Sequence, residues 1–137
     1  MRTDEEILAR IKEVERNDWL GTERGDLIEV LPFENVKPFL EEGVTEEEWT
    51  PLARDPDSVK ARMLDYMPFA WEKANDCRGI SASRSMSHFA AWTWLIGEDF
   101  GNLQKYEFYG KPNLVAICER FGWDHKQWDD GERTNTG

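Results

Sequence analysis

The stretch SASRSMSHFAAWTWLIGED, residues 81–99, decides the fold, because it joins a polar start to the densest apolar run of the chain. Its apolar residues recur at helical spacing on two faces: Phe89, Trp92 and Ile96 on one, and Met86, Ala90 and Trp94 on the other. A helix that is apolar around most of its circumference is a central, buried one. We therefore predict a buried Trp-rich helix over residues 82–96, stopped by Gly97, as the centre of the fold.

Helix signals flank this stretch on both sides. Thr3 with Glu6 matches a capping box that opens a helix over residues 4–15. The Asp55-Pro56 pair starts another helix, which Pro68 is expected to kink or break. Shorter helices are expected before Pro32, over residues 33–43 with Val36, Phe39 and Leu40 inward, from Thr45 through Trp49 and Leu52, and from Pro112 to Gly122.

Convincing alternating strand patterns are absent, so the predicted class is mostly α. We expect one compact helical domain over residues 1–137, with an irregular loop near 98–111 and a frayed tail at about 132–137. Gly21 and Gly25 are expected to interrupt the chain before the helix that ends at Pro32.

Composition points to a folded protein that needs no disulfide, metal or cofactor. The 137 residues are 12% aromatic and include seven Trp, which supplies ample apolar surface for a core. No run approaches the roughly 20 apolar residues of a membrane span, and the charged N-terminus does not resemble a signal peptide. A cytoplasmic location is the default expectation. Cys77 and Cys118 are then expected to be small buried residues.

The net charge of −11 is concentrated in the first half of the chain. Residues 1–76 carry 20 Asp and Glu against 10 Lys and Arg, whereas residues 77–137 carry 8 against 7. Binding to a phosphate backbone needs a basic surface, so direct contact with nucleic acid is not expected. A basic protein surface is a suitable partner for such a chain.

The densest acidic run is LEEGVTEEEW, residues 40–49, which has five glutamates and no base. The predicted partner-binding residues are Glu41, Glu42, Glu46, Glu47, Glu48, Asp55 and Asp57. Such a surface can steer a basic protein into contact, or imitate a nucleic acid and inhibit the protein that binds it. The competing interpretation is that these carboxylates only solubilise the chain and stabilise helix N-termini, where Glu46, Glu47 and Glu48 are expected to lie.

A second candidate site is the polar start of the central helix. Ser85 and His88 are spaced i, i+3, and Arg84 could bind an anionic group. Arg84, Ser85 and His88 therefore form the alternative ligand-binding set, for a small enzyme or an anionic-ligand binder. Catalysis by serine also needs an orienting group and oxyanion donors, which the sequence does not reveal. Helix-capping serines and an internal salt bridge of Arg84 are the structural alternative.

Metal binding is not expected. The Cys and His residues are Cys77, His88, Cys118 and His125, and no two of them have the short spacing of a zinc site. Asp124, His125, Asp129 and Asp130 could hold a hard cation, but a solvated turn is the simpler interpretation of this run.

Five segments of the sequence together resemble segments of known proteins. They are RGDLIEVLPFENVKPFL, VTEEEW, MPFAWEKANDCRGISASRSMSH, AWTWLIGED and YGKPNLVAICERFGWDHKQWDDG. As a set they resemble a group of small proteins encoded by phages and prophages, over most of residues 17–131. The resemblance implies a bacterial host cytoplasm, a non-virion protein and an action on host or phage machinery. Our leading hypothesis is a non-enzymatic binding protein, and a virion or assembly component is a further alternative.

Overall fold

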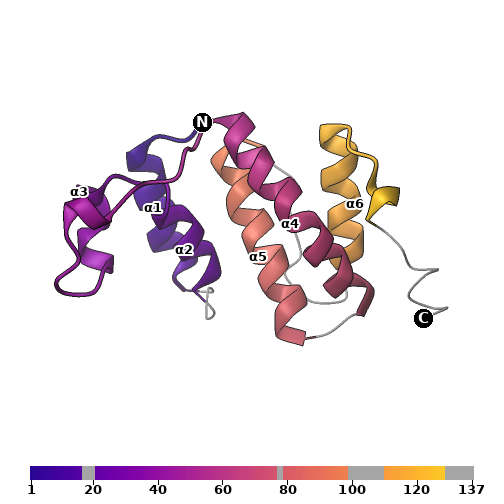
Figure 1. Cartoon of the computed structure of the whole chain (residues 1–137), viewed down its shortest axis with the longest axis horizontal. Helices are drawn as coiled ribbons and strands as arrows, with labels where there is room; N and C mark the ends of the chain where they lie inside the picture. Colours follow the sequence, from indigo (N-terminus) through magenta and orange to yellow (C-terminus); the bar gives the residue numbers. More distant parts are fainter. Residues whose placement is uncertain (17–20, 77–78, 99–109, 129–137) are drawn as a thin grey trace.

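The computed structural model describes residues 1–16, 21–76, 79–98 and 110–128, and these residues form helices and turns without a strand (Figure 1). The α-helices are α1 Asp4–Val14, α2 Thr22–Ile28, α3 Phe33–Val36, α4 Pro56–Asp76, α5 Gly79–Leu95 and α6 Gly110–Phe121. Single 3-10 turns are η1 Lys37–Phe39, η2 Glu46–Glu48 and η4 His125–Gln127. The mostly α class and the compact helical domain are confirmed. Residues 99–109 of the predicted loop, and the predicted frayed tail, lie outside the described residues.

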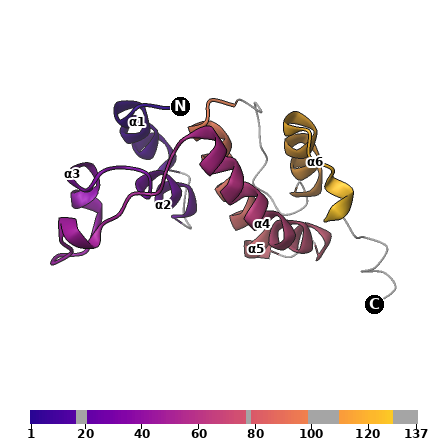
Figure 2. The ribbon, with the colours of Figure 1, turned by 45° about the horizontal axis from the view of Figure 1, so that its top comes forward.

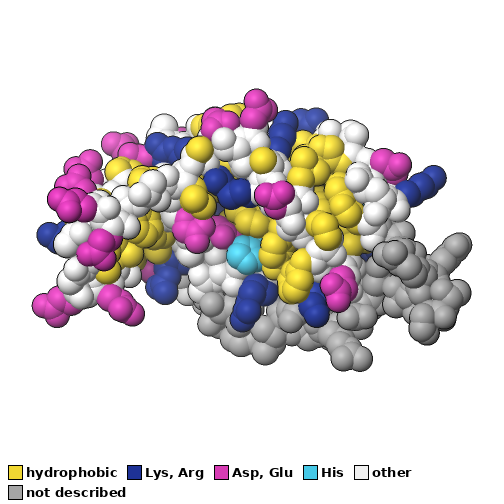
Figure 3. Space-filling model, in the orientation of Figure 1, with side chains coloured by type: hydrophobic (Ala, Val, Ile, Leu, Met, Phe, Trp, Pro, Cys, Tyr) yellow, Lys and Arg dark blue, Asp and Glu magenta, His cyan; other side chains and the backbone are white. Residues whose placement is uncertain are grey.

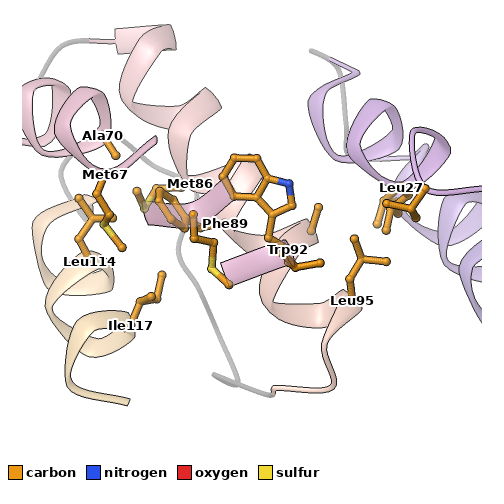
Figure 4. Close-up of a cluster of buried hydrophobic side chains, with 14 of the residues drawn as sticks. Leu27, Met67, Ala70, Met86, Phe89, Trp92, Leu95, Leu114 and Ile117 are labelled. Atoms are coloured by element: carbon orange, nitrogen blue, oxygen red, sulfur yellow. The ribbon is translucent and has the colours of Figure 1, made fainter. Parts of the chain in front are cut away.

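Helix α5 is the centre of the molecule, as its apolar circumference predicts. It packs against α2, α4 and α6, which are contributed by three separate parts of the sequence (Figure 1). Its buried apolar side chains meet those of its neighbours in one cluster (Figure 4): Met86, Phe89, Trp92 and Leu95 from α5, Leu27 from α2, Met67 and Ala70 from α4, and Leu114 and Ile117 from α6. Burying each larger apolar side chain contributes roughly 1.5–3 kcal/mol. The helix ends before Gly97, whose φ of 81° suits a residue without a Cβ.

Helix α1 begins with the predicted capping box. The Thr3 hydroxyl accepts a hydrogen bond from the Glu6 backbone N–H at 3.2 Å, and the Glu6 carboxylate accepts one from the Thr3 N–H at 3.1 Å. The latter bond lowers the pKa of Glu6. The buried face of α1 consists of Ile7, Ile11 and Val14, at the spacing of one helical stripe.

The first residues of the chain are bound to the C-terminal end of α5. Arg2 donates from Nε to the Trp94 carbonyl at 2.9 Å, and its backbone N–H donates to the Leu95 carbonyl at 3.2 Å. The guanidinium groups of Arg2 and Arg10 lie 4.6 Å and 5.5 Å from the centre of the Trp94 ring. These cation–π contacts and hydrogen bonds join two points that are 92 residues apart in sequence.

Helix α4 starts where the Asp55-Pro56 pair predicts. The Asp55 carboxylate accepts hydrogen bonds from the Ser58 backbone N–H at 2.9 Å and from the Ser58 hydroxyl at 2.6 Å, which together lower the pKa of Asp55. The helix continues through Pro68 to Asp76 without a break, and Figure 2 shows that its direction changes along its length. Pro68 is exposed, so water can satisfy the backbone carbonyl that it leaves unpaired.

Three local predictions are wrong. The helix expected from Thr45 through Leu52 is only the turn η2, because Thr50 precedes Pro51 and such a residue disfavours helical backbone. Phe39, expected to face inward, is 39% exposed, because the chain tightens into the turn η1 beside Pro38. Gly25 does not interrupt the chain but lies within α2.

The C-terminal elements agree with prediction. Helix α6 ends before Gly122, which has a φ of 75°, and buries Leu114, Ile117 and Cys118. Burial raises the pKa of the Cys118 thiol to about 11, so it remains a neutral core residue. Among the described residues, no helix combines the length and the apolar content that crossing a bilayer requires.

The central role of α5 gives a stability prediction with a matched control. Leu95→Ala removes a fully buried side chain at the junction of α5 with α2, so we expect the free energy of unfolding to fall by about 2–5 kcal/mol. Leu64→Ala makes the same chemical change on α4 at a side chain that is 37% exposed, and should cost much less. Urea denaturation of the two variants measures the difference. Equal losses would contradict the central position of α5.

Candidate functional site

The acidic segment, defined as residues 40–54, crosses the surface between the turn η1 and helix α4. Its five glutamates are exposed, as are the two aspartates that follow it: Glu41, Glu42, Glu46, Glu47, Glu48, Asp55 and Asp57. The space-filling view shows acidic side chains gathered around the end of the molecule that carries α3 (Figure 3). The structure thus brings most of the predicted partner-binding residues to one end of the protein.

The five glutamates have no basic partner within the described part of the chain. The ion pairs there use Arg2, Arg10, Arg24, Arg54, His88 and Arg120, and all their acidic partners lie outside residues 41–48. Among the residues that the structure describes, the only side-chain hydrogen bond to one of these glutamates comes from the Thr45 hydroxyl, which donates to Glu48 at 3.0 Å. Their charge is therefore not used inside the described structure.

The helix-dipole explanation does not hold for Glu46, Glu47 and Glu48. They form a single 3-10 turn, after which Trp49 has an extended backbone with φ −100° and ψ 116°. A turn of three residues has no helix dipole of useful size to stabilise. Asp55 and Asp57 differ, because they lie at the start of the 21-residue helix α4, where Asp55 is the cap. The seven predicted residues thus divide into five glutamates without a capping role and two aspartates at a helix start.

Despite its lack of regular structure, the acidic segment is fixed at several points. The Trp49 indole N–H donates to the Leu31 carbonyl at 2.8 Å, and the Leu52 backbone N–H donates to the Glu29 carbonyl at 2.8 Å. Arg62 of α4 donates to the Ala53 carbonyl at 2.6 Å. In addition, Arg54 forms an ion pair with Asp4 of α1. These bonds tie the segment to α1, to α4 and to the end of α2.

Exposed apolar side chains lie on both sides of the glutamates in sequence. Phe39, directly before the acidic segment, is 39% exposed, and Leu52 within it is 41% exposed. Apolar anchors next to charged groups are typical of protein-binding surfaces, where the apolar groups supply affinity and the charges supply orientation.

The alternative site on α5 is rearranged relative to prediction. Ser85 is fully buried and hydrogen-bonds to the Tyr66 side chain, so it cannot act as an exposed nucleophile. Arg84 is exposed, and the described part of the chain does not contain the internal salt bridge that was expected for it. An exposed guanidinium keeps its hydration and needs no such partner.

His88, by contrast, has a buried acidic partner that the sequence analysis missed. Its Nδ1 lies 2.5 Å from Oδ2 of Asp26, which is only 6% exposed. A signal for this contact was present in the sequence: α2 carries an acidic residue at positions 23 and 26, followed by Glu29, whereas residues 77–97 contain no acid at all. Complementary charge on two packed helices favours such a pair, but the facing residues emerge only from the helix packing.

Two neighbouring groups titrate away from their usual ranges. Partial removal from water raises the pKa of the Glu29 carboxyl, and the Asp26 carboxylate raises it further. Burial also raises the pKa of Tyr66, against the opposing effects of the Ser85 hydrogen bond and the Arg84 charge. Asp26, Glu29, Tyr66, Arg84 and His88 therefore form one electrostatic neighbourhood at the junction of α2, α4 and α5.

The structure offers no metal centre in the region that it describes, where no three His, Cys, Asp or Glu side chains are placed to hold an ion. Cys77, Asp129 and Asp130 from the candidate sets lie outside the described residues. His125 is stacked on Trp71, with 5.7 Å between ring centres, and Cys118 is buried in the core.

The chain matches no protein-family model, no curated protein and no solved structure.

The attachment of the acidic segment can be tested through Trp49. Trp49→Phe keeps an aromatic ring but removes the hydrogen bond to the Leu31 carbonyl, which is worth about 0.5–1.5 kcal/mol. We expect faster amide hydrogen exchange at the Leu52 N–H, which depends on the same attachment. Trp128→Phe is the matched control, since Trp128 packs against the core far along the sequence. Unchanged exchange at Leu52 in the Trp49 variant would show that the segment is held by other contacts.

Proposed function

We propose that this protein is a binding protein that uses the acidic segment to contact a basic protein surface. The observation that carries the proposal is the state of five neighbouring glutamates, which are exposed, have no basic partner among the described residues and lie on a fixed segment. Two unit charges about 10 Å apart in water repel each other by roughly 0.4 kcal/mol. A run of unpaired glutamates therefore disfavours the free protein slightly and favours a complex in which a basic partner pairs with them.

The partner that this chemistry fits is a protein that itself binds nucleic acid. Such proteins display Lys and Arg side chains that neutralise phosphates. Carboxylates held in fixed positions can pair with the same Lys and Arg side chains. Phe39 and Leu52 would add apolar contacts beside the charges. The resemblance to phage and prophage proteins supports a bacterial cytoplasm as the setting, with a host or phage protein as the target that is inhibited or redirected.

A capture experiment with two charge-matched variants tests the proposal. The test variant is Glu42→Gln, Glu46→Gln, Glu47→Gln, and the control variant is Glu5→Gln, Glu72→Gln, Glu119→Gln, whose residues are also exposed but lie on α1, α4 and α6. Both variants lose three negative charges. We expect the wild type and the control to retain the same proteins from a bacterial lysate, and the test variant to lose them.

Salt and competing DNA then define the nature of the captured contact. We expect release between about 0.1 M and about 1 M salt, where the Debye length falls from about 10 Å to about 3 Å. Duplex DNA should displace the captured protein if carboxylates and phosphates bind the same surface. Retention by the test variant, or binding that is indifferent to salt, would contradict the proposal.

The same variants separate a binding role from a structural role. Glu42, Glu46 and Glu47 have no side-chain partner among the described residues. We therefore expect the free energy of unfolding in urea to differ by less than about 0.5 kcal/mol between the test variant and the wild type, and any difference should favour the variant. A loss of more than about 1 kcal/mol would instead indicate that these glutamates hold the segment together.

A further inference from the structure

The outward face of α4 carries a row of side chains that the binding proposal does not use. Residues spaced four apart form one ridge along a helix. The α4 ridge consists of Lys60, Leu64, Pro68 and Glu72. Leu64 is 37% exposed, Pro68 and Glu72 are exposed, and Lys60 is partly buried. Figure 3 shows apolar side chains gathered over α4 and α6 on the face where this ridge is accessible.

The apolar part of this surface is unusual for the molecule. Five large apolar side chains are exposed among the described residues, and two of them, Leu64 and Phe69, lie on α4. The other three are Met1, Phe39 and Leu52, which lie outside the α-helices. Within the described ranges, α4 is therefore the one α-helix that presents large apolar side chains to solvent, as a helix does where another molecule packs against it.

The two ends of the α4 ridge carry opposite charges. The ion pairs of the described residues include neither Lys60 nor Glu72. Lys60 Nζ lies 5.0 Å from the centre of the Phe121 ring, a contact that leaves its charge unneutralised. From its N-terminal to its C-terminal end, the ridge is thus basic, apolar, apolar and acidic.

This order makes the α4 ridge complementary to itself when it is reversed. If two copies meet with their α4 helices antiparallel, Lys60 of each copy faces Glu72 of the other. Leu64 of each copy then faces Pro68 of the other, and the apolar pairs lie at the centre of the contact. A twofold axis repeats every contact, as in most homodimers, and the charge pairs fix the register of the two helices.

The shape of α4 limits how far such a contact can extend. Its direction changes along its length (Figure 2), and two ridges of this type cross at about −50°, so close packing is confined to the middle of the helix. Asp65 is exposed beside that middle, and the twofold axis brings its two copies near each other. A small interface with one repulsive pair of charges forms a weak dimer, which depends on protein concentration.

We propose that two copies of this chain associate through the α4 ridge as a symmetric antiparallel dimer. The ridge shares no residue with the acidic segment, so the dimer does not depend on the partner that is proposed for that segment. A dimer of this kind carries two acidic segments, and it can therefore bind a partner with repeated basic surfaces more tightly than one copy can.

Sedimentation equilibrium of the full chain tests the association directly. At about 0.1 M salt, where the Debye length is about 10 Å, repulsion between the acidic ends of two copies is partly screened. We expect the mass to rise from the 16.0 kDa of one chain toward twice that value as the concentration increases from about 10 μM to about 1 mM. A constant monomer mass would overturn the proposal. Growth beyond a dimer would also overturn it, because a twofold interface is complete with two copies.

A pair of matched variants tests whether α4 is the surface involved. Leu64→Glu places a charge at the centre of the contact and should weaken association by about tenfold or more. Leu52→Glu adds the same charge at a side chain that is 41% exposed in the acidic segment, and should leave association unchanged. Equal effects of the two variants would overturn the assignment to α4.

Charge reversal tests the antiparallel register. Lys60→Glu and Glu72→Lys each place like charges opposite each other at both ends of the contact, so each variant alone should associate less than the wild type. A mixture of the two variants restores opposite charges at both ends and should associate as the wild type does. Asp65→Asn should strengthen association. A mixture that stays monomeric, while helical circular dichroism shows both variants folded, would overturn the antiparallel pairing.

Discussion

The structure depends on the burial of one helix, α5, among three others. A helix can be enclosed in this way only if it carries no unpaired carboxylate toward its neighbours, and residues 77–97 contain no acid. Its partly inward polar groups have partners: Ser85 bonds to Tyr66 of α4, Thr93 donates to the Phe89 carbonyl, and His88 contacts Asp26 of α2. Apart from the buried Glu23 and Asp26 of α2, the carboxylates of the described residues lie at the periphery of this acid-free centre.

The peripheral carboxylates do not have equal roles. Glu6 and Asp55 cap helices, and each has a lowered pKa because backbone or side-chain donors stabilise its charged form. Within the described ranges the glutamates of the acidic segment have no such donors except at Glu48, although hydrogen bonds and an ion pair hold the segment itself in place. Stabilising contacts thus involve the backbone and flanks of this segment, and its charges remain available to another molecule.

Much of the fold could be predicted from local signals. The caps at Thr3 and Asp55, the apolar stripes and the stop at Gly97 are short-range features, so α1, α4 and α5 lie where the sequence indicates. The prediction failed where two local signals compete, as at Thr45, where a capping pattern precedes Pro51. The exposed glutamates could be predicted from composition. The Asp26–His88 pair could not, because its partners lie 62 residues apart and meet only through the packing of α2 on α5.

The cation–π contacts of Arg2 and Arg10 with Trp94 affect how the chain folds during its synthesis. Because a ribosome releases α1 first, this helix leaves the exit tunnel long before the last turn of α5 exists to receive it. The contacts of Arg2 with Trp94 therefore close only after 92 further residues have been added to the chain. The backbone hydrogen bond from Arg2 to the Leu95 carbonyl likewise cannot form until residue 95 has emerged, so this end of α1 is fixed late in folding during synthesis.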